Sequence, residues 1–373
     1  MLLMASEGLG IGRVARQFPD NPIWQFLAYQ TEHVEWRGCA LWDLIQPSFM
    51  FMVGVAMPFS IANRKSRGEG FNRLLGHALW RSLALIALGI FLRSVGRKQT
   101  YFTFEDVLTQ IGLGYTFLFL VAWTKPKVQF GIAVVILLLY WGAFALFPLP
   151  GTDFDFQKVD VSANWQHLTG FAAHWDKNSN FAAAFDQWFL NLFPREKPFV
   201  FNGGGYLTLS FVPSLATMIF GLLAGNLLRQ QTDSSTKVRW LVIVGISGLV
   251  LGTVLDVTGI CPSVKRIWSP SWVLFSTGWT CLLLAGFYGI IDWKQHKKWA
   301  FPLVVVGVNS IAMYLMAHLF HGFIGSSFKT HFGKKFFEVF GTVYAPILEM
   351  SVVLFVLWLI CLWMYRRKLF LKI

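Results

Sequence analysis

The chain has 373 residues, of which 55% are hydrophobic and only 14% charged, and its mean hydropathy is +0.52. A soluble domain carries about 25% charged residues, so this composition excludes a soluble globular protein and predicts an integral membrane protein. The formal net charge is +13. The basic residues lie in short loops between apolar runs, as membrane topology alone requires, so nucleic acid binding is not expected.

About ten membrane spans are predicted, which makes the expected fold an all-α, polytopic transmembrane helix bundle. Residues 1–16 form an apolar stretch interrupted by Glu7 and Arg13, which we interpret as an incomplete or very short first helix. Residues 17–38 are predicted to be a polar loop. The nine clearer spans are expected at about 39–61, 74–94, 104–123, 128–147, 206–228, 239–257, 271–291, 300–322 and 343–365. No internal repeat is evident, so residues 1–373 are predicted to form a single transmembrane domain.

The loops after alternate spans, together with the C-terminal end, carry half of the 32 Lys and Arg residues. These sixteen are Arg64, Lys65, Arg67, Arg73, Lys125, Lys127, Arg229, Lys237, Arg239, Lys294, Lys297, Lys298, Arg366, Arg367, Lys368 and Lys372. Short loops rich in Lys and Arg face the cytoplasm. Ten spans then place both termini in the cytoplasm, and a bacterial inner membrane is the expected location.

One long loop, about 148–205, is predicted on the outer face. Loops of this length are uncommon unless they are functional or disordered. Its aromatic residues are mixed with Asn and Asp, which favours a folded segment. A carbohydrate-facing lid and a surface cap without a ligand are equally open interpretations.

The stretch from Thr31 to Ile61 is the first candidate site, because a polar loop leads directly into a membrane-length apolar run. Asp43 lies about one turn inside that run, and His33 precedes it by ten residues. Ionisable groups at the membrane usually serve a function, and a histidine near a carboxylate can act as a general base. The alternative is a surface histidine and an aspartate that only caps the helix.

Other polar residues in apolar surroundings are candidates for substrate binding. They are Asn309, Ser310 and His318 in the span 300–322, Lys265, Arg266 and Trp268 in the outer loop 256–271, and Gln110 near the start of the span 104–123. Hydrogen bonding between helices and anchoring at the membrane interface would explain the same residues without a ligand. The four cysteines have no metal-ligand spacing, so no metal site is expected.

Several motifs resemble one enzyme family. Residues 33–54 read HVEWRGCALWDLIQPSFMFMVG, which resembles the pattern H-x-x-W-x-G-x-x-x-x-D-L-x-x-P-x-F-x-F-x-x-G of the heparan-alpha-glucosaminide N-acetyltransferase family and its bacterial relatives. Further similar segments follow in the same order at 107–112 (VLTQIG), 267–271 (IWSPS), 309–311 (NSI) and 365–373 (YRRKLFLKI). Gln110 follows Thr109 where the family has a Gln-Arg pair.

The resemblance implies that an acetyl group passes from cytosolic acetyl-CoA, as co-substrate, to a terminal glucosamine or another glycan acceptor on the outer side. It assigns the catalytic histidine to His33 and the acid of the same motif to Asp43. His33 would act as a base or carry the acetyl group itself. We expect the phosphates of CoA to meet the basic cytoplasmic residues Arg64, Lys65 and Arg67.

Two other classes of protein fit the same polar groups. A transporter or flippase for a lipid-linked sugar or a small anion is the main alternative, and the absence of recognisable half-repeats or broken helices speaks against it. A non-catalytic membrane scaffold is the other. Membrane lipid is an expected partner in every case, and the plentiful apolar residues leave a homodimer open.

Overall fold

The computed structural model describes residues 1–371, and Lys372 and Ile373 lie outside the described residues. No strand forms between residues 1 and 371, where the one isolated bridge pairs Arg37 with Val264. The helices are α1 (Leu2–Ala5), α2 (Ile11–Ala15), α3 (Pro22–Thr31), α4 (Ile45–Lys65), α5 (Phe71–Ser94), α6 (Val107–Val121), α7 (Pro126–Ala145), α8 (Phe181–Phe189), α9 (Phe211–Arg229), α10 (Ser234–Val257), α11 (Pro270–Phe287), α12 (Phe301–Gly307), α13 (Ser310–Phe332) and α14 (Ala345–Arg366). The predicted all-α fold is confirmed.

Eight helical segments of the described chain are long and apolar enough to cross a membrane, which identifies an integral membrane protein. They are Leu41–Lys65, Phe71–Ser94, Pro126–Ala145, Thr208–Arg229, Ser234–Val257, Pro270–Trp293, Ser310–Phe332 and Thr342–Arg366. Two shorter apolar helices, Val107–Val121 and Lys298–Gly307, accompany them.

The structure corrects three sequence-based predictions near the two ends of the chain. The apolar stretch 1–16 is not one helix, because Glu7 to Gly10 adopt positive φ angles between α1 and α2. The polar loop 17–38 contains α3, which Asn21 caps by accepting the N–H groups of Ile23 and Trp24. The predicted span 300–322 is broken at Asn309, where α12 ends and α13 begins.

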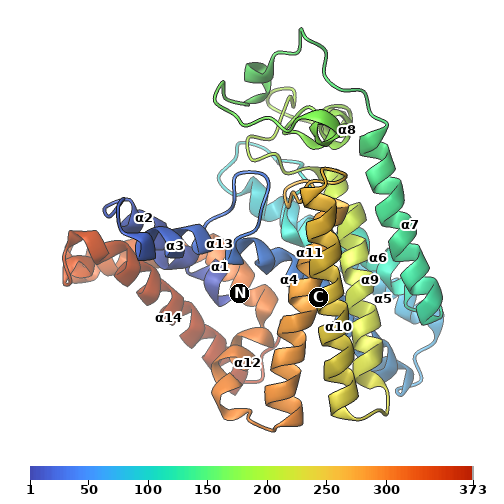
Figure 1. Ribbon diagram of the computed structural model, residues 1–373. Helices are drawn as coiled ribbons and strands as arrows, with labels where there is room; N and C mark the ends of the chain where they lie inside the picture. The colour runs from blue at the N-terminus through green and yellow to red at the C-terminus, as the bar shows by residue number, and fades with distance from the viewer. Residues whose placement is uncertain (372–373) are drawn as a thin grey trace. The chain divides into compact units, whose positions relative to one another are not determined.

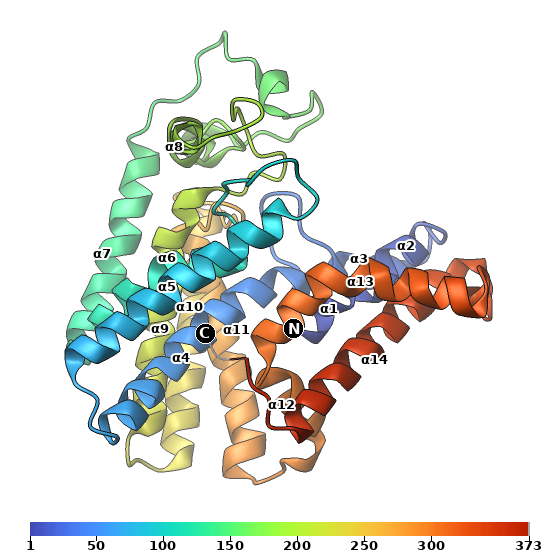
Figure 2. The same ribbon diagram turned by 180° about the vertical axis from the view of Figure 1, so that it is seen from behind.

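Contacts divide the described chain into two compact units. The terminal unit contains Met1–Glu35, Cys39–Ile45 and the chain from Ile290 onward, and the central unit contains Trp36–Gly38 and Gln46–Gly289. In the terminal unit α13 and α14 run side by side (Figure 2). Their shared core is formed by Ala5, Val305, Val306, Met313, Ala317, Ile324, Val353, Leu357 and Cys361.

The central unit brings α4 and α9 together at glycines. A methyl group placed on Gly54 of α4 would lie 1.9 Å from the Met218 carbonyl oxygen, and one on Gly221 of α9 would lie 2.0 Å from the Phe51 carbonyl oxygen. Small residues allow such close helix approach in membranes, where dispersion contacts replace the hydrophobic driving force. Two other neighbouring pairs also pack against each other, α5 with α6 and α10 with α11, and the second pair is seen side by side in Figure 1.

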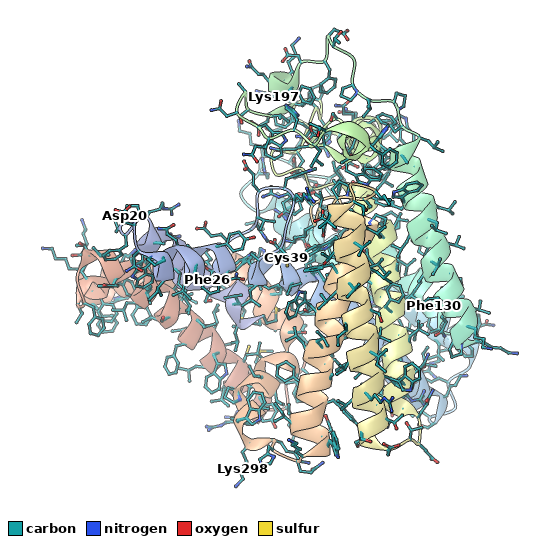
Figure 3. The ribbon with its side chains drawn as sticks, viewed as in Figure 1. Asp20, Phe26, Cys39, Phe130, Lys197 and Lys298 are labelled. Atoms are coloured by element: carbon teal, nitrogen blue, oxygen red, sulfur yellow. The ribbon has the colours of Figure 1, made fainter. Side chains whose placement is uncertain are left out.

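The long loop after α7 is a folded cap rather than a disordered segment. It includes α8 and several short 3-10 turns, and Trp175 is fully buried within it. The Trp36 indole N–H donates to the Trp175 carbonyl oxygen at 3.1 Å. Lys197 lies in this cap, whereas Phe130 lies near the other end of α7 (Figure 3). The prediction of a folded loop is confirmed, and the choice between a lid and a plain cap stays open.

Asp186 is a buried carboxyl group in the cap. Its Oδ2 accepts the backbone N–H of Thr208 at 2.9 Å, yet burial dominates and raises the pKa of Asp186 to about 7. The neighbouring Glu105 raises this pKa further, and Arg195 lowers it. A raised folded-state pKa stabilises the fold fully below the unfolded value of 3.8, and this contribution is lost as the pH rises towards 7.

We expect Gly54→Ala to lower the free energy of unfolding by about 1–3 kcal/mol, because the methyl group forces α4 and α9 apart. Thermal unfolding in detergent, followed with a dye that reacts with newly exposed thiols, measures the loss. Gly76→Ala in α5 is the control, since a methyl group there meets nothing within 4 Å. Equal melting temperatures for the two variants would contradict the close-packing account.

We expect Asp186→Asn to be more stable than the wild type at pH 8, because it removes a buried group that must ionise there. The difference should shrink as the pH falls from 8 to below 3.8, where the wild-type carboxyl group is protonated in both the folded and the unfolded state. Apparent melting temperatures measured across this pH range test the expectation. Asp153→Asn, in an exposed part of the same loop, is the control, and an identical pH trend in both variants would contradict it.

Candidate active site

The His33–Asp43 pair forms within the terminal unit, at the start of a membrane-length helix. Residues Leu41–Leu44 make a 3-10 turn that continues directly into α4. Asp43 Oδ2 accepts the backbone N–H groups of Ala40 at 3.1 Å and Val34 at 3.3 Å. The N–H of Ala40 lies at the helix start, where it has no partner within the helix, so the Asp43 carboxylate satisfies it. Asp43 therefore does cap the helix, as the simpler interpretation expected.

The second carboxylate oxygen of Asp43 holds His33. The distance from Asp43 Oδ1 to His33 Nδ1 is 2.7 Å, and the Asp43 side chain is 1% exposed while that of His33 is 37% exposed. An ionised carboxylate only accepts hydrogen bonds, so Nδ1 carries the proton. The Asp43 side chain therefore both caps the helix and orients His33.

The other ring nitrogen of His33 faces Trp42, the residue next to Asp43. The Trp42 indole N–H donates to His33 Nε2 at 3.0 Å, and the two rings meet edge to face at 82° with their centroids 5.9 Å apart. Because an indole N–H can only donate, Nε2 carries a lone pair. The tautomer of His33 follows from these two contacts.

The loop that carries His33 is held from several sides. Gln30 Oε1 accepts the backbone N–H of Leu41 at 2.9 Å, and the Tyr29 hydroxyl donates to the Cys39 carbonyl oxygen at 3.3 Å. Gly8, at φ 63°, lies so close that a methyl group on it would be 2.8 Å from the Thr31 carbonyl oxygen. These contacts fix the segment between α3 and the 3-10 turn, as a precise catalytic geometry requires.

Such a pair has the chemistry of a general base. An imidazole oriented by a carboxylate through Nδ1 offers Nε2 as the proton acceptor, and the carboxylate stabilises the imidazolium that forms. The partial exposure of His33 leaves the ring accessible. No cluster of three or more His, Cys, Asp or Glu residues suited to a metal occurs within residues 1–371.

Asn309 and Ser310 lie where the predicted span 300–322 is broken, and Asn309 stabilises this break. The Asn309 side-chain amide donates to the Leu369 carbonyl oxygen at 3.0 Å, and its oxygen accepts the Leu371 backbone N–H at 3.1 Å. Asn309 thus fastens the C-terminal segment to the gap between α12 and α13. Ser310 begins α13 and lies next to this gap.

His318 follows two turns later on α13 and is exposed. Its Nδ1 lies 2.9 Å from the Tyr314 carbonyl oxygen, and its ring lies over the Tyr314 ring with centroids 4.3 Å apart. His321, further along the same helix, faces Glu7 at 3.7 Å. The expected role of His318 in substrate binding stays a prediction.

In the central unit, Lys265 and Arg266 converge on one aromatic ring. Lys265 Nζ lies 5.7 Å and the Arg266 guanidinium carbon 5.2 Å from the centroid of Tyr206, and Arg266 also donates to the Gly204 carbonyl oxygen at 2.5 Å. Trp268 is buried and donates to the Thr217 hydroxyl at 3.3 Å. These residues hold the glycine-containing segment that leads into α9.

Gln110 is buried at the start of α6, where its side-chain N–H groups donate to the carbonyl oxygens of Phe104 at 2.7 Å and Thr208 at 3.0 Å. Its side-chain oxygen is buried without a hydrogen-bond partner. Gln110 therefore joins two loops of the central unit. Substrate binding by Gln110 and by the Lys265–Trp268 segment stays a prediction.

The three basic residues expected to meet CoA lie at or just beyond the end of α4. Arg64 pairs with Glu69 at 3.3 Å and contacts His77, and the Lys65 ammonium lies 3.9 Å from the centroid of the Trp123 ring. Arg67 lies in the exposed turn that follows. Lys65 and Arg67 are exposed and Arg64 is half-buried, and their binding of CoA stays a prediction.

Trp42 is the residue of this site that reasoning from the sequence overlooked. Its position beside Asp43 at the start of the helix was visible, but an aromatic residue there is expected at any membrane interface. Gln30 was overlooked for a similar reason, because α3 was predicted to be loop. Only the folded backbone brings both side chains to the His33 segment.

We expect Asp43→Ala to lower the free energy of unfolding by about 1–3 kcal/mol, because two backbone N–H groups lose their acceptor. Asp43→Asn keeps an acceptor oxygen and should lose less. Thermal unfolding of both variants in the same detergent compares them. If Asp43→Asn lost as much as Asp43→Ala, the stabilising contribution would come from the charge instead of the capping hydrogen bonds.

Comparison with known proteins gives one consistent similarity. No protein-family model matches the chain. The chain is 24% identical over 392 residues to the heparan-alpha-glucosaminide N-acetyltransferase of Homo sapiens, and 24% identical over 393 residues to that of Mus musculus. Each match covers 92% of this chain but 56% of the relative, so the chain spans about half the length of these curated relatives.

Proposed function

We propose that this chain, whose resemblance to the heparan-alpha-glucosaminide N-acetyltransferases is confirmed along most of its length, is an acetyl-CoA-dependent membrane acetyltransferase. The acceptor is a terminal glucosamine-like amino sugar or another glycan. The observation that carries the proposal is the His33–Asp43 contact of 2.7 Å, which joins the two residues that the motif resemblance assigns to catalysis.

His33 acts as the general base in the proposed reaction. The acceptor, as a neutral amine, attacks the thioester carbonyl carbon, and Nε2 of His33 takes a proton from the amine nitrogen as the C–N bond forms. The C–S bond then breaks, and the departing CoA thiolate receives that proton from the imidazolium. The products are an N-acetyl amide and free CoA, and Asp43 stabilises the transient positive charge on the ring.

A second route uses the same atoms in two steps. Nε2 attacks the thioester carbon, the C–S bond breaks, and CoA leaves as a thiolate that takes up a proton from solvent, while the acetyl group rests on the imidazole. The amine then attacks the acetyl carbon, the bond from this carbon to Nε2 breaks, and the amine proton is released to solvent. Both routes need an unprotonated Nε2 and an oriented ring. They differ in whether an acetylated His33 accumulates when acetyl-CoA is supplied without acceptor.

The remaining polar residues take supporting roles in this proposal. A donor to the developing oxyanion is needed, and Ser310 suits it better than Asn309, whose amide already binds the C-terminal segment. Arg67, with Arg64 and Lys65, attracts the phosphates of CoA. His318, which belongs to the same unit as His33, contributes to binding of the acceptor.

The orientation follows from charge. Loops rich in Lys and Arg face the cytoplasm, where acetyl-CoA is made, and both termini lie there as well. The folded cap then faces outward, as an acceptor glycan on the outer side requires. We place the protein in a bacterial inner membrane, where the acceptor would belong to the cell envelope.

A transporter or flippase is the second candidate, and one observation favours it more than the sequence did. The helix break at Asn309 contradicts the expectation that no broken helix is present, and discontinuous helices are common at transporter binding sites. A transporter has no need for the oriented base at His33, and it would not bind acetyl-CoA.

Acetyl transfer from radiolabelled acetyl-CoA to glucosamine, by the purified protein in detergent, tests the proposal. We expect His33→Ala to lower the rate at least about 100-fold, because the base is removed. His331→Ala, at the exposed end of α13, is the control and should retain activity. Equal melting temperatures of the variants establish that the loss is chemical.

Two outcomes would overturn this proposal. Full transfer by His33→Ala would remove His33 from the mechanism while leaving the enzyme class intact. An absence of both acetyl-CoA binding and transfer by the folded wild-type protein would favour the transporter.

A further inference from the structure

The hydrogen bond between Trp42 and His33 indicates a role for Trp42, which stands at a variable position of the motif. We propose that Trp42 is a positioning residue that keeps Nε2 of His33 unprotonated in the resting protein and yields this atom to the acceptor amine. The inference rests on the proposed function, since it concerns the same base.

Asp43 and Trp42 approach the imidazole from opposite nitrogens. Asp43 Oδ1 lies 2.7 Å from Nδ1, and the Trp42 indole N–H lies on the Nε2 side with a nitrogen–nitrogen distance of 3.0 Å. The two residues are neighbours in the 3-10 turn Leu41–Leu44, whose tight geometry directs both side chains to one ring. The imidazole is therefore held in a defined orientation and a single tautomer.

The indole N–H discriminates between the protonation states of His33. The indole N–H can donate to Nε2 only while Nε2 has its lone pair. Once Nε2 is protonated, two N–H groups would face each other and no hydrogen bond could form between them. The contact thus favours the neutral ring and opposes the imidazolium. Of the charged side chains, Asp43 pairs directly with the ring, whereas the Glu32 carboxylate lies against Gly12. Asp43 favours the imidazolium, and the Trp42 N–H opposes it.

Trp42 also occupies the position that the substrate must reach. A base takes a proton along the direction of its lone pair, and the indole N–H already lies there. The acceptor amine must replace the indole as the partner of Nε2. The far edge of the indole lies against Gly8, where an added methyl group would be 3.2 Å from Trp42 Cζ3. This contact sets the resting position of the half-buried indole.

Trp42→Phe tests the role, because phenylalanine keeps an aromatic ring and lacks the N–H. We expect the acid limb of the pH–rate profile to move to higher pH by about half to one unit, the effect of losing one neutral hydrogen bond. The KM for the acceptor should fall several-fold, since no indole has to be displaced. Trp24→Phe, whose ring stacks on Phe18 at 6.1 Å in the same unit, is the matched control and should change neither quantity.

A second readout does not need activity. In protein labelled with ¹⁵N at histidine, with His33 assigned by comparison with His33→Gln, the wild type should show a neutral ring protonated at Nδ1. The Nε2 resonance should move in Trp42→Phe and stay unchanged in Trp24→Phe. An unchanged Nε2 resonance in Trp42→Phe, or an unchanged pH profile and KM in an active enzyme, would overturn the role of Trp42.

The two proposals fail in different ways. If the wild type transfers no acetyl group, the proposed function is wrong, and the Nε2 resonance still reports whether Trp42 holds the ring. If the wild type is active and Trp42→Phe matches it in both readouts, the proposed function stands and the positioning role is wrong.

Discussion

The buried carboxylate of Asp43 is the interaction on which the candidate site depends. One oxygen accepts the backbone N–H of Ala40, at the start of a membrane-length helix, and that of Val34 in the preceding loop, and the other oxygen binds Nδ1 of His33. A carboxylate with 1% exposure is costly unless all its acceptor positions are used. The same need for partners therefore explains why the helix starts here and why the histidine is held here.

Several other polar side chains in the apolar chain are bound to backbone groups. Asn309 joins a helix break to the C-terminal segment, and Gln110 joins two loops through the carbonyl oxygens of Phe104 and Thr208. In a membrane, backbone groups outside regular helices need partners from the protein. Polar residues of this chain therefore serve as structural supports. His33 differs in that both ring nitrogens bind side chains and the ring remains partly exposed.

The sequence motif around His33 divides between the two compact units. His33, Trp42 and Asp43 belong to the terminal unit, while Trp36 belongs to the central unit and donates to the carbonyl oxygen of Trp175 in the cap. Residues of this short motif therefore have two different roles. Some of its residues build the candidate base, and others anchor the cap that the proposed orientation turns towards the acceptor.

The sequence by itself determined the membrane class, most of the spans and the His33–Asp43 candidate, because apolar length and isolated ionisable residues are properties of local sequence. It did not predict α3, because a helix of 10 residues is too short to stand out as a membrane span. It did not predict the break at Asn309 either, because an apolar run does not reveal where its backbone hydrogen bonds are interrupted. The sequence also did not predict the tautomer of His33. That depends on which groups reach the two ring nitrogens, and only the folded turn that directs Asp43 and Trp42 to the same imidazole decides it.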